Sequence, residues 1–262
     1  MKTLGLALGA GGSRGVAHIG FLQALEEAGI RPDFVTGCSM GSIVGACYCA
    51  GVSPSAMREA VIDLKLWDIA ALNVAPIRKN GLMRMTKARK RIVDLMGEKT
   101  FDELEIPFAC VATDLLKGRV VVLDKGNVID AVLASSSIPG AFTPAKAGEH
   151  EMLVDGGILE RVPTRELKRM GAEVIVAVDV LGNLMVEKEV KENLLGTLLR
   201  CIDIMDTRMT ERKRASRKYV DLWLEPELGG MDQYAVKELQ FAYDKGYELG
   251  KEKAEEIARL IQ

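Results

Sequence analysis

The chain has 262 residues, 48% of them hydrophobic, and a formal net charge of −2. This composition predicts a soluble globular protein with one large core, and the nearly balanced charge argues against general nucleic-acid binding. The five cysteines form no CxxC pair, so we expect reduced, mostly buried thiols and a cytoplasmic location. No repeat or low-complexity linker interrupts the chain, so we expect residues 1–262 to form a single domain.

Two kinds of local pattern alternate along the chain. Apolar runs predict strands at residues 3–8, 33–36, 107–115, 119–123, 152–154 and 173–180. Helical spacing of apolar residues predicts helices at residues 15–28, 41–50, 54–65, 127–135, 163–170, 192–215 and 235–260. This alternation predicts an α/β fold with a largely parallel central sheet covered by helices on both faces.

A glycine-rich loop, Gly9-Ala10-Gly11-Gly12-Ser13-Arg14-Gly15, follows the first predicted strand. A dinucleotide-binding fingerprint would need glycine where Arg14 stands, and a Walker A loop would need Gly-Lys-Ser/Thr at its end. A third interpretation is an oxyanion hole, because a chain without Cβ atoms can turn its backbone N–H groups toward a substrate carbonyl. The plain alternative is a tight strand-to-helix turn.

Residues Gly37-Cys38-Ser39-Met40-Gly41 spell G-x-S-x-G between a short apolar strand and an apolar helix. This is the layout of a nucleophile elbow, which lifts the serine hydroxyl above the sheet and beside a helix N-terminus. Ser39 is therefore the candidate nucleophile, and we expect the Cys38 side chain to point away from it. The uncharged stretch 34–57 is long enough to suggest a transmembrane helix, but its glycines and prolines favour a buried strand–turn–helix.

The general base is harder to assign, because the chain has only two histidines. His18 lies on the first predicted helix and His150 in a polar turn, so a packed and a solvated role are the simpler interpretations. A Ser–acid–His order would allow His150 only with one of four acids, Asp102, Asp114, Asp124 or Asp130. Asp155 offers another solution, since it ends a short apolar strand before two glycines and could serve Ser39 directly. An ordinary Asp-Gly turn explains the same pattern.

Five segments together resemble the patatin-like phospholipases in order and spacing, over about residues 3–180. These segments are residues 9–15, 17–20, 37–41, 134–144 and 155–157. The resemblance implies the patatin-like fold, hydrolysis of lipid acyl esters and a Ser-Asp dyad, with Ser39 as nucleophile and Asp155 as base. It also implies an oxyanion hole of backbone N–H groups, which we place at Gly11, Gly12, Ser13 and Met40. His18 matches a helix position that has no catalytic role in the family.

Two basic segments are candidates for contact with lipid. Residues 66–97 mix apolar and basic side chains, as a lid at a membrane surface would, although a helical cap with a solvated basic face is the simpler interpretation. Residues 208–218 form a second basic cluster, for which an exposed helix end is the simpler interpretation. The sequence has no HExxH motif and no acidic loop of EF-hand spacing, so we expect no metal and no cofactor.

We therefore expect a serine acyl hydrolase that acts on phospholipid or lysophospholipid esters, with transient contact to a membrane surface. An esterase or thioesterase for small soluble acyl groups would use the same site. A non-catalytic acyl-lipid sensor is a third interpretation, although the intact Ser39, Asp155 and glycine loop argue against it. Head group, chain length and oligomeric state stay open at this point.

Overall fold

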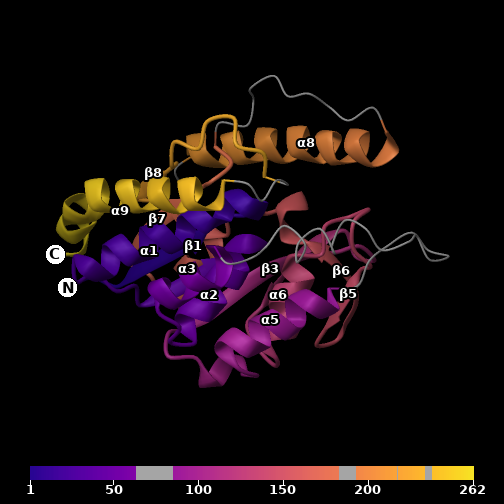
Figure 1. The fold of residues 1–262 in the computed structure, drawn as a ribbon, viewed down its shortest axis with the longest axis horizontal. Coiled ribbons are helices and arrows are strands. Elements are labelled where there is room, and N and C mark those ends of the chain that lie inside the picture. The colour runs from indigo at the N-terminus through magenta and orange to yellow at the C-terminus, as the bar shows by residue number, and fades with distance from the viewer. Residues whose placement is uncertain (63–84, 183–192, 217, 234–237) are drawn as a thin grey trace.

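The structure is a computed structural model that describes residues 1–62, 85–182, 193–216, 218–233 and 238–262. Its centre is an eight-stranded sheet with the order β5-β6-β3-β2-β1-β7-β8, in which β4 also pairs with β3 (Figure 1). The strands are β1 (Leu4–Leu8), β2 (Phe34–Gly37), β3 (Phe108–Asp114), β4 (Arg119–Leu123), β5 (Ala145–Ala147), β6 (His150–Asp155), β7 (Val174–Val178) and β8 (Leu222–Leu224).

The five neighbouring strands β3, β2, β1, β7 and β8 run parallel to one another. An antiparallel extension is formed by β4 and β6, which pair with β3, and by β5, which pairs with β6. The expected α/β fold with helices around a central sheet is confirmed. The antiparallel extension includes β5, which the sequence pattern did not predict, as it did not predict β8. Each of these two strands has only three residues, too few to show an alternating pattern.

The described residues contain eight α-helices and three 3₁₀ turns. The α-helices are α1 (Ala17–Glu27), α2 (Met40–Cys49), α3 (Pro54–Ile62), α5 (Thr86–Met96), α6 (Val128–Ser135), α7 (Thr164–Met170), α8 (Leu194–Ser216) and α9 (Leu239–Ile261). The 3₁₀ turns are η1 (Gly12–Val16), η2 (Phe101–Glu103) and η3 (Gly156–Ile158). Figure 1 shows α9 lying along α1, and α8 crossing one side of the molecule above them.

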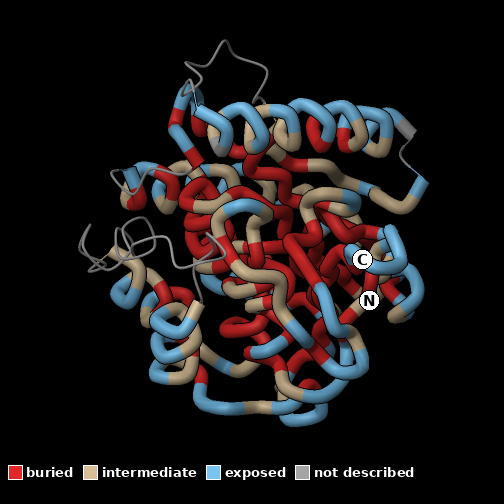
Figure 2. Tube along the Cα trace, turned by 90° about the vertical axis from the view of Figure 1, so that its right-hand side faces the viewer, coloured by how far each residue is buried: buried red, intermediate tan, exposed pale blue. Residues whose placement is uncertain are grey.

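Successive residues of β1 contact helices on opposite faces of the sheet. Leu4, Leu6 and Leu8 belong to the core cluster that contains residues of α1 and α9. Ala7 belongs to a second cluster, in which it meets Leu167 of α7. Because side chains alternate along a strand, the two clusters lie on the two faces, and both faces are covered by helices. Figure 2 shows the buried strands and helix faces inside a shell of exposed turns and outer helix faces.

Strands β2 and β6 lie end to end along one edge of β3. The residues of β3 from Cys110 to Asp114 pair with β4, which occupies the other edge. Gly37 of β2 pairs with Cys110, and Asp155 of β6 pairs with Ala112. Because β2 runs parallel to β3 and β6 runs antiparallel, the C-terminal ends of β2 and β6 face each other. This is the point where the candidate nucleophile and the candidate base leave the sheet.

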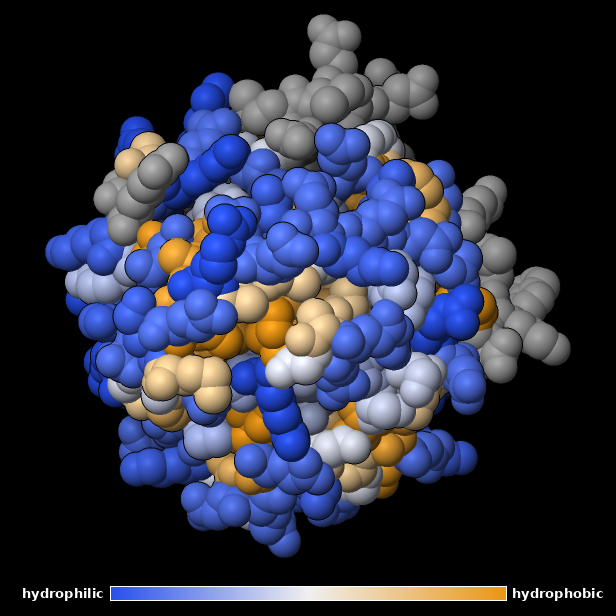
Figure 3. Space-filling view, turned by 90° about the vertical axis from the view of Figure 1, so that its left-hand side faces the viewer, coloured by the Kyte–Doolittle hydropathy of each residue, from blue (hydrophilic) through white to orange (hydrophobic). Residues whose placement is uncertain are grey.

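The surface carries mixed character. The face drawn in Figure 3 is covered mostly by hydrophilic residues, with smaller apolar patches between them. In the part of the chain that the structure describes, no helix is both long and apolar enough to span a bilayer. The stretch 34–57 forms β2, the turn at Ser39, α2 and the start of α3, as the strand–turn–helix interpretation predicts.

Candidate active site

Ser39 sits on a strained turn between β2 and α2. Its φ of 52° and ψ of −124° make it the only non-glycine residue with positive φ in the described ranges. The two flanking glycines are required by close backbone contacts. A Cβ on Gly41 would lie 2.3 Å from the Leu8 carbonyl oxygen, and one on Gly37 would lie 2.5 Å from the Gly41 carbonyl oxygen. The G-x-S-x-G spacing therefore follows from the packing of the turn against β1 and against the start of α2.

Asp155 lies within hydrogen-bond distance of the Ser39 hydroxyl. Ser39 Oγ donates to Asp155 Oδ2 at 2.6 Å, and the Gly157 N–H donates to Asp155 Oδ1 at 2.8 Å. Both Ser39 and Asp155 are only 7% exposed. Burial raises the pKa of Asp155 to about 6, although the hydrogen bonds from Ser39 and Gly157 act to lower it. A carboxylate with this pKa is ionised at neutral pH and is a stronger base than an ordinary aspartate.

Neither histidine contacts this pair. His18 lies on α1, with its Nε2 2.8 Å from the Gly9 carbonyl oxygen. Burial lowers the pKa of His18 to about 4, so its imidazole is neutral at pH 7 and donates from Nε2 to that carbonyl. His150 Nδ1 lies 3.2 Å from Asp114 Oδ2 instead. The structure thus brings Ser39 together with Asp155 and leaves both imidazoles elsewhere.

The glycine loop lies between β1 and α1, as expected, and its N–H groups divide into two sets. Ser13 donates its N–H to the Gln233 carbonyl at 2.9 Å, so the expectation of a free N–H at Ser13 is wrong. The N–H groups of Gly11, Gly12 and Met40 donate no hydrogen bond to another of the described residues. Gly12 needs to be glycine, because its φ is +52° and a Cβ would lie 2.2 Å from the Gln233 carbonyl oxygen.

Arg14 explains why the loop does not match a dinucleotide fingerprint. Its buried guanidinium donates to three main-chain carbonyls, those of Val180, Gly229 and Met231, at 2.7–3.1 Å. The side chain therefore fixes the loop to the segments after β7 and β8. No local pattern in the sequence predicts this role of Arg14, because its partners lie about 170–220 positions away in the chain.

A second buried arginine, whose role no local sequence pattern predicts, anchors α8 beside the loop. Arg161 Nη2 pairs with Asp179 Oδ2 and its Nη1 pairs with Asp206 Oδ2, each at 2.8 Å. Its carbonyl oxygen accepts the N–H of Ala10 at 3.0 Å. All three charged side chains are at least nine-tenths buried, so the ion pairs are shielded from solvent. This triad connects the glycine loop, β7 and α8.

Cys38 is not suited to act as the nucleophile. Its side chain is fully buried, and its sulfur lies 4.0 Å from Asp155 Oδ1 rather than beside the Ser39 hydroxyl. Burial, followed by the nearby Asp155 carboxylate, raises the pKa of the Cys38 thiol well above its usual range. The thiol therefore stays protonated at neutral pH, whereas a cysteine nucleophile must be a thiolate.

The two basic segments lie partly within the described residues. Of the segment 66–97, residues 66–84 lie outside them; α5 buries Ile92 and Met96 against the core and exposes Lys87 and Lys90. This part agrees with the helical-cap interpretation. In the segment 208–218, three basic residues form ion pairs with carboxylates, namely Arg208, Lys213 and Arg214.

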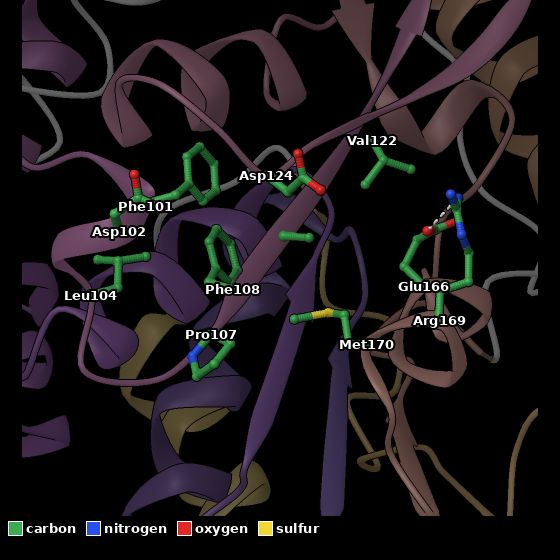
Figure 4. A pocket seen from close by; sticks show the side chains of 11 residues that line it. Phe101, Asp102, Leu104, Pro107, Phe108, Val122, Asp124, Glu166, Arg169 and Met170 are labelled. Carbon is green, nitrogen blue, oxygen red and sulfur yellow. Dashed lines mark hydrogen bonds and ion pairs between the residues drawn. The ribbon is translucent and has the colours of Figure 1, made fainter.

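A pocket of about 640 Å³ lies away from Ser39 and Asp155 (Figure 4). Its lining includes the apolar side chains of Phe101, Phe108 and Met170, together with Asp124 and the ion-paired Glu166 and Arg169. Neither member of the Ser39–Asp155 pair lines it. Within the described residues, no group of three or more histidine, cysteine, aspartate or glutamate side chains could hold a metal ion.

The fold and the paired Ser39 and Asp155 define an α/β protein with an elbow serine and an adjacent aspartate. The chain belongs to the patatin-like phospholipase family, whose family model matches residues 6–168. The matched range includes the glycine loop, the elbow and Asp155. The similarity to this family found in the sequence motifs is thereby confirmed.

Individual proteins agree with this assignment. An uncharacterized NTE family protein of Mycobacterium bovis is 36% identical over 178 residues, which are 68% of this chain and 49% of that protein. The lysophospholipase NTE1 of Coccidioides immitis is 35% identical over 184 residues, which are 68% of this chain and 12% of that protein. The chain thus matches about half the length of the mycobacterial relative and far less of the fungal one. In structure, VipD from Legionella pneumophila shares the fold, with a TM-score of 0.58, 15% identity, and coverage of 97% of this chain and 67% of VipD.

Proposed function

We propose that this protein is a serine acyl hydrolase that cleaves ester bonds of phospholipids or lysophospholipids. The observation that carries the proposal is the 2.6 Å hydrogen bond from the Ser39 hydroxyl to Asp155 at the end of β6. Membership of the patatin-like phospholipase family and the similarity to a fungal lysophospholipase support a lipid ester as the substrate.

In the first half of the reaction, Ser39 Oγ attacks the ester carbonyl carbon while Asp155 Oδ2 accepts the hydroxyl proton. The carbonyl oxygen becomes an oxyanion, which the N–H groups of Gly11, Gly12 and Met40 stabilise together with the N-terminus of α2. The intermediate collapses to an acyl-serine ester, and the departing alcohol takes the proton from Asp155. The carboxylate is then ready for a second cycle of proton transfer.

In the second half, water attacks the acyl-serine carbonyl and gives a proton to Asp155. The second oxyanion uses the same N–H groups, and its collapse releases the fatty acid and returns the proton to Ser39 Oγ. A carboxylate is a weak base toward a serine hydroxyl, so the reaction depends on the N–H groups that stabilise the alkoxide character of each transition state. Burial raises the pKa of Asp155 and so narrows the gap between the pKa of its carboxyl group and that of the serine hydroxyl.

A substrate panel tests the proposal. Purified protein is given lysophospholipids and phospholipids of defined chain length and a series of short p-nitrophenyl esters, with Ser39→Ala and Asp155→Asn as controls. We expect long-chain lipid esters to be hydrolysed, and both variants to be inactive. Turnover of only the short esters would favour an esterase, and binding of acyl lipids without any turnover would favour a sensor.

A further inference from the structure

The backbone N–H of Ser39 has a specific acceptor on α6. Ser39 donates this N–H to Ser135 Oγ at 2.9 Å, and the Ser135 side chain at the end of α6 is completely buried. The donor belongs to the one strained non-glycine residue of the described chain. A buried N–H in this conformation cannot use water, so it depends on the acceptor that the fold provides.

The same short segment also holds the partner of Ser39. Asp155 donates its own backbone N–H to the carbonyl oxygen of Ser137 at 2.9 Å. Residues 135–137 therefore contact the main chain of both Ser39 and Asp155. The start of α6 is fixed as well, because the Asn127 side chain accepts the N–H of Asp130 at 3.0 Å.

We propose that Ser135 is a positioning residue for the nucleophile: its hydroxyl oxygen holds the Cys38–Ser39 peptide in the orientation that directs Ser39 Oγ at Asp155. This inference rests on the proposed function, which assigns Ser39 as the nucleophile. The Ser39 N–H then stabilises the elbow through its hydrogen bond to Ser135 and does not bind the oxyanion. The oxyanion is left to the N–H groups of Gly11, Gly12 and Met40.

The physical reason is the cost of an unsatisfied buried donor. Without the Ser135 oxygen, the Ser39 N–H would remain unpaired or the Cys38–Ser39 peptide would rotate toward another acceptor. Rotation of this peptide changes the direction of the Ser39 side chain and lengthens the bond to Asp155. Because the reaction requires the hydroxyl and the carboxylate in contact, a small change of this kind slows the chemical step more than substrate binding.

Threonine and valine at position 135 form a matched pair for the test. The two side chains have nearly the same shape, but only threonine keeps the hydroxyl oxygen that accepts the Ser39 N–H. We measure the rate of fluorophosphonate labelling at Ser39 and the hydrolysis of p-nitrophenyl butyrate. Ser135→Thr is expected to exceed Ser135→Val by about 10- to 100-fold in labelling rate and in kcat, with similar KM. Equal rates for the two variants would overturn the proposal.

Ser137→Ala is the control for a merely structural effect. Ser137 is buried on the same segment, and its hydroxyl donates to the Leu133 carbonyl at 2.8 Å, not to Ser39 or Asp155. We expect this variant to lose thermal stability without a comparable loss of labelling rate. An equal loss of labelling in Ser137→Ala and Ser135→Val would contradict the specific role of Ser135.

A spectroscopic readout separates this claim from the proposed function. The amide proton of Ser39 is expected to resonate downfield in Ser135→Thr and to shift upfield in Ser135→Val, because the hydrogen bond is lost. If the wild type is not labelled at Ser39, the proposed function fails, while the amide shift still decides whether Ser135 holds the elbow. An unchanged Ser39 amide shift would overturn the positioning role itself.

Discussion

Gly37 and Asp155 lie on the same edge of β3, beside Cys110 and Ala112, which are two positions apart. The two strands approach from opposite directions, so sheet register brings Ser39, two residues after the end of β2, close to Asp155 at the end of β6. The register of the central sheet therefore places the turn that carries Ser39 beside Asp155. We expect the pair to be preformed before any substrate binds.

The pH dependence of activity follows from the pKa of Asp155. In the proposed mechanism Asp155 must be ionised to accept the Ser39 proton, and burial raises the pKa of Asp155 to about 6. We expect kcat/KM for p-nitrophenyl butyrate to fall below about pH 6 with the slope of one proton. An acid limb near pH 4, the range of an ordinary aspartate, would contradict this assignment.

Replacement of the base separates the dyad from a histidine triad. Asp155→Asn keeps the shape of the side chain but removes the proton acceptor, so kcat is expected to fall by at least about a thousandfold. His150→Gln serves as the control, because His150 contacts Asp114 and not the Ser39 hydroxyl. It is expected to retain most of the wild-type activity in the same assay. A His150→Gln variant as inactive as Asp155→Asn would point to a triad.

The Asp155→Asn substitution is expected to raise stability, although it lowers activity. The pKa of Asp155 is higher in the folded protein than its usual 3.8, so the folded state holds this proton more tightly and loses stability as pH rises from about 4 to about 6. Asp155→Asn avoids this loss and is expected to gain up to roughly 3 kcal/mol over the wild type between pH 4 and pH 7. Urea unfolding of both proteins at the two pH values measures the gain.

His18, whose pKa is lowered, contributes equally to both proteins and cancels in the difference. A gain that is the same at pH 4 and pH 7 would show that Asp155 has an ordinary pKa.

Thiol reactivity tests the placement of the cysteines. Cys201 is exposed, whereas the other four cysteines, Cys38, Cys47, Cys49 and Cys110, are buried. A thiol-specific reagent is therefore expected to modify one thiol rapidly in the folded protein and all five after denaturation. Hydrolysis should survive this modification, and Cys201→Ser should remove the fast phase. Rapid inactivation that Cys201→Ser does not prevent would implicate Cys38.

The buried triad around Arg161 is expected to be important for stability. Arg161→Met leaves Asp179 and Asp206 buried without their common partner, which costs about 3–5 kcal/mol of unfolding free energy. Arg208→Met is the matched control on α8, because Arg208 forms an exposed ion pair with Glu211 and should change stability by less than about 1 kcal/mol. Equal midpoints of urea unfolding for the two variants would contradict the structural role of the triad.

Much of this architecture is visible in local sequence patterns, because strands and turns near the elbow leave strong signals. The apolar run before the glycine loop and the G-x-S-x-G spacing correspond directly to β1, β2 and α2. The strand before Asp155 was also expected. Its antiparallel pairing with β3 was not, since pairing across the sheet depends on register between segments far apart in the chain.

The pairing of the N–H groups around the site cannot be predicted from local sequence, for a common physical reason. The Ser13 N–H is occupied by Gln233, and the Ser39 N–H is occupied by Ser135, through contacts 220 and 96 residues apart in sequence (233 − 13 and 135 − 39). A loop rich in glycine shows that N–H groups can turn inward, but only tertiary contacts decide which of them are already paired. The serine run at 135–137 lies in a segment that resembles the family, but no local pattern assigns it a role. The contact that reveals the role of this run is the one between the buried Ser135 hydroxyl and the Ser39 N–H, and it exists only in the folded chain.

Covalent labelling tests the assignment of Ser39 as the nucleophile without the need for a known substrate. Wild-type protein, Ser39→Ala and Asp155→Asn are treated with a fluorophosphonate probe, and the modified residue is located by mass spectrometry. We predict a single adduct on Ser39 in the wild type, no adduct in Ser39→Ala and much slower labelling in Asp155→Asn. An adduct on another residue, or continued labelling and ester hydrolysis by Ser39→Ala, would show that Ser39 is not the nucleophile.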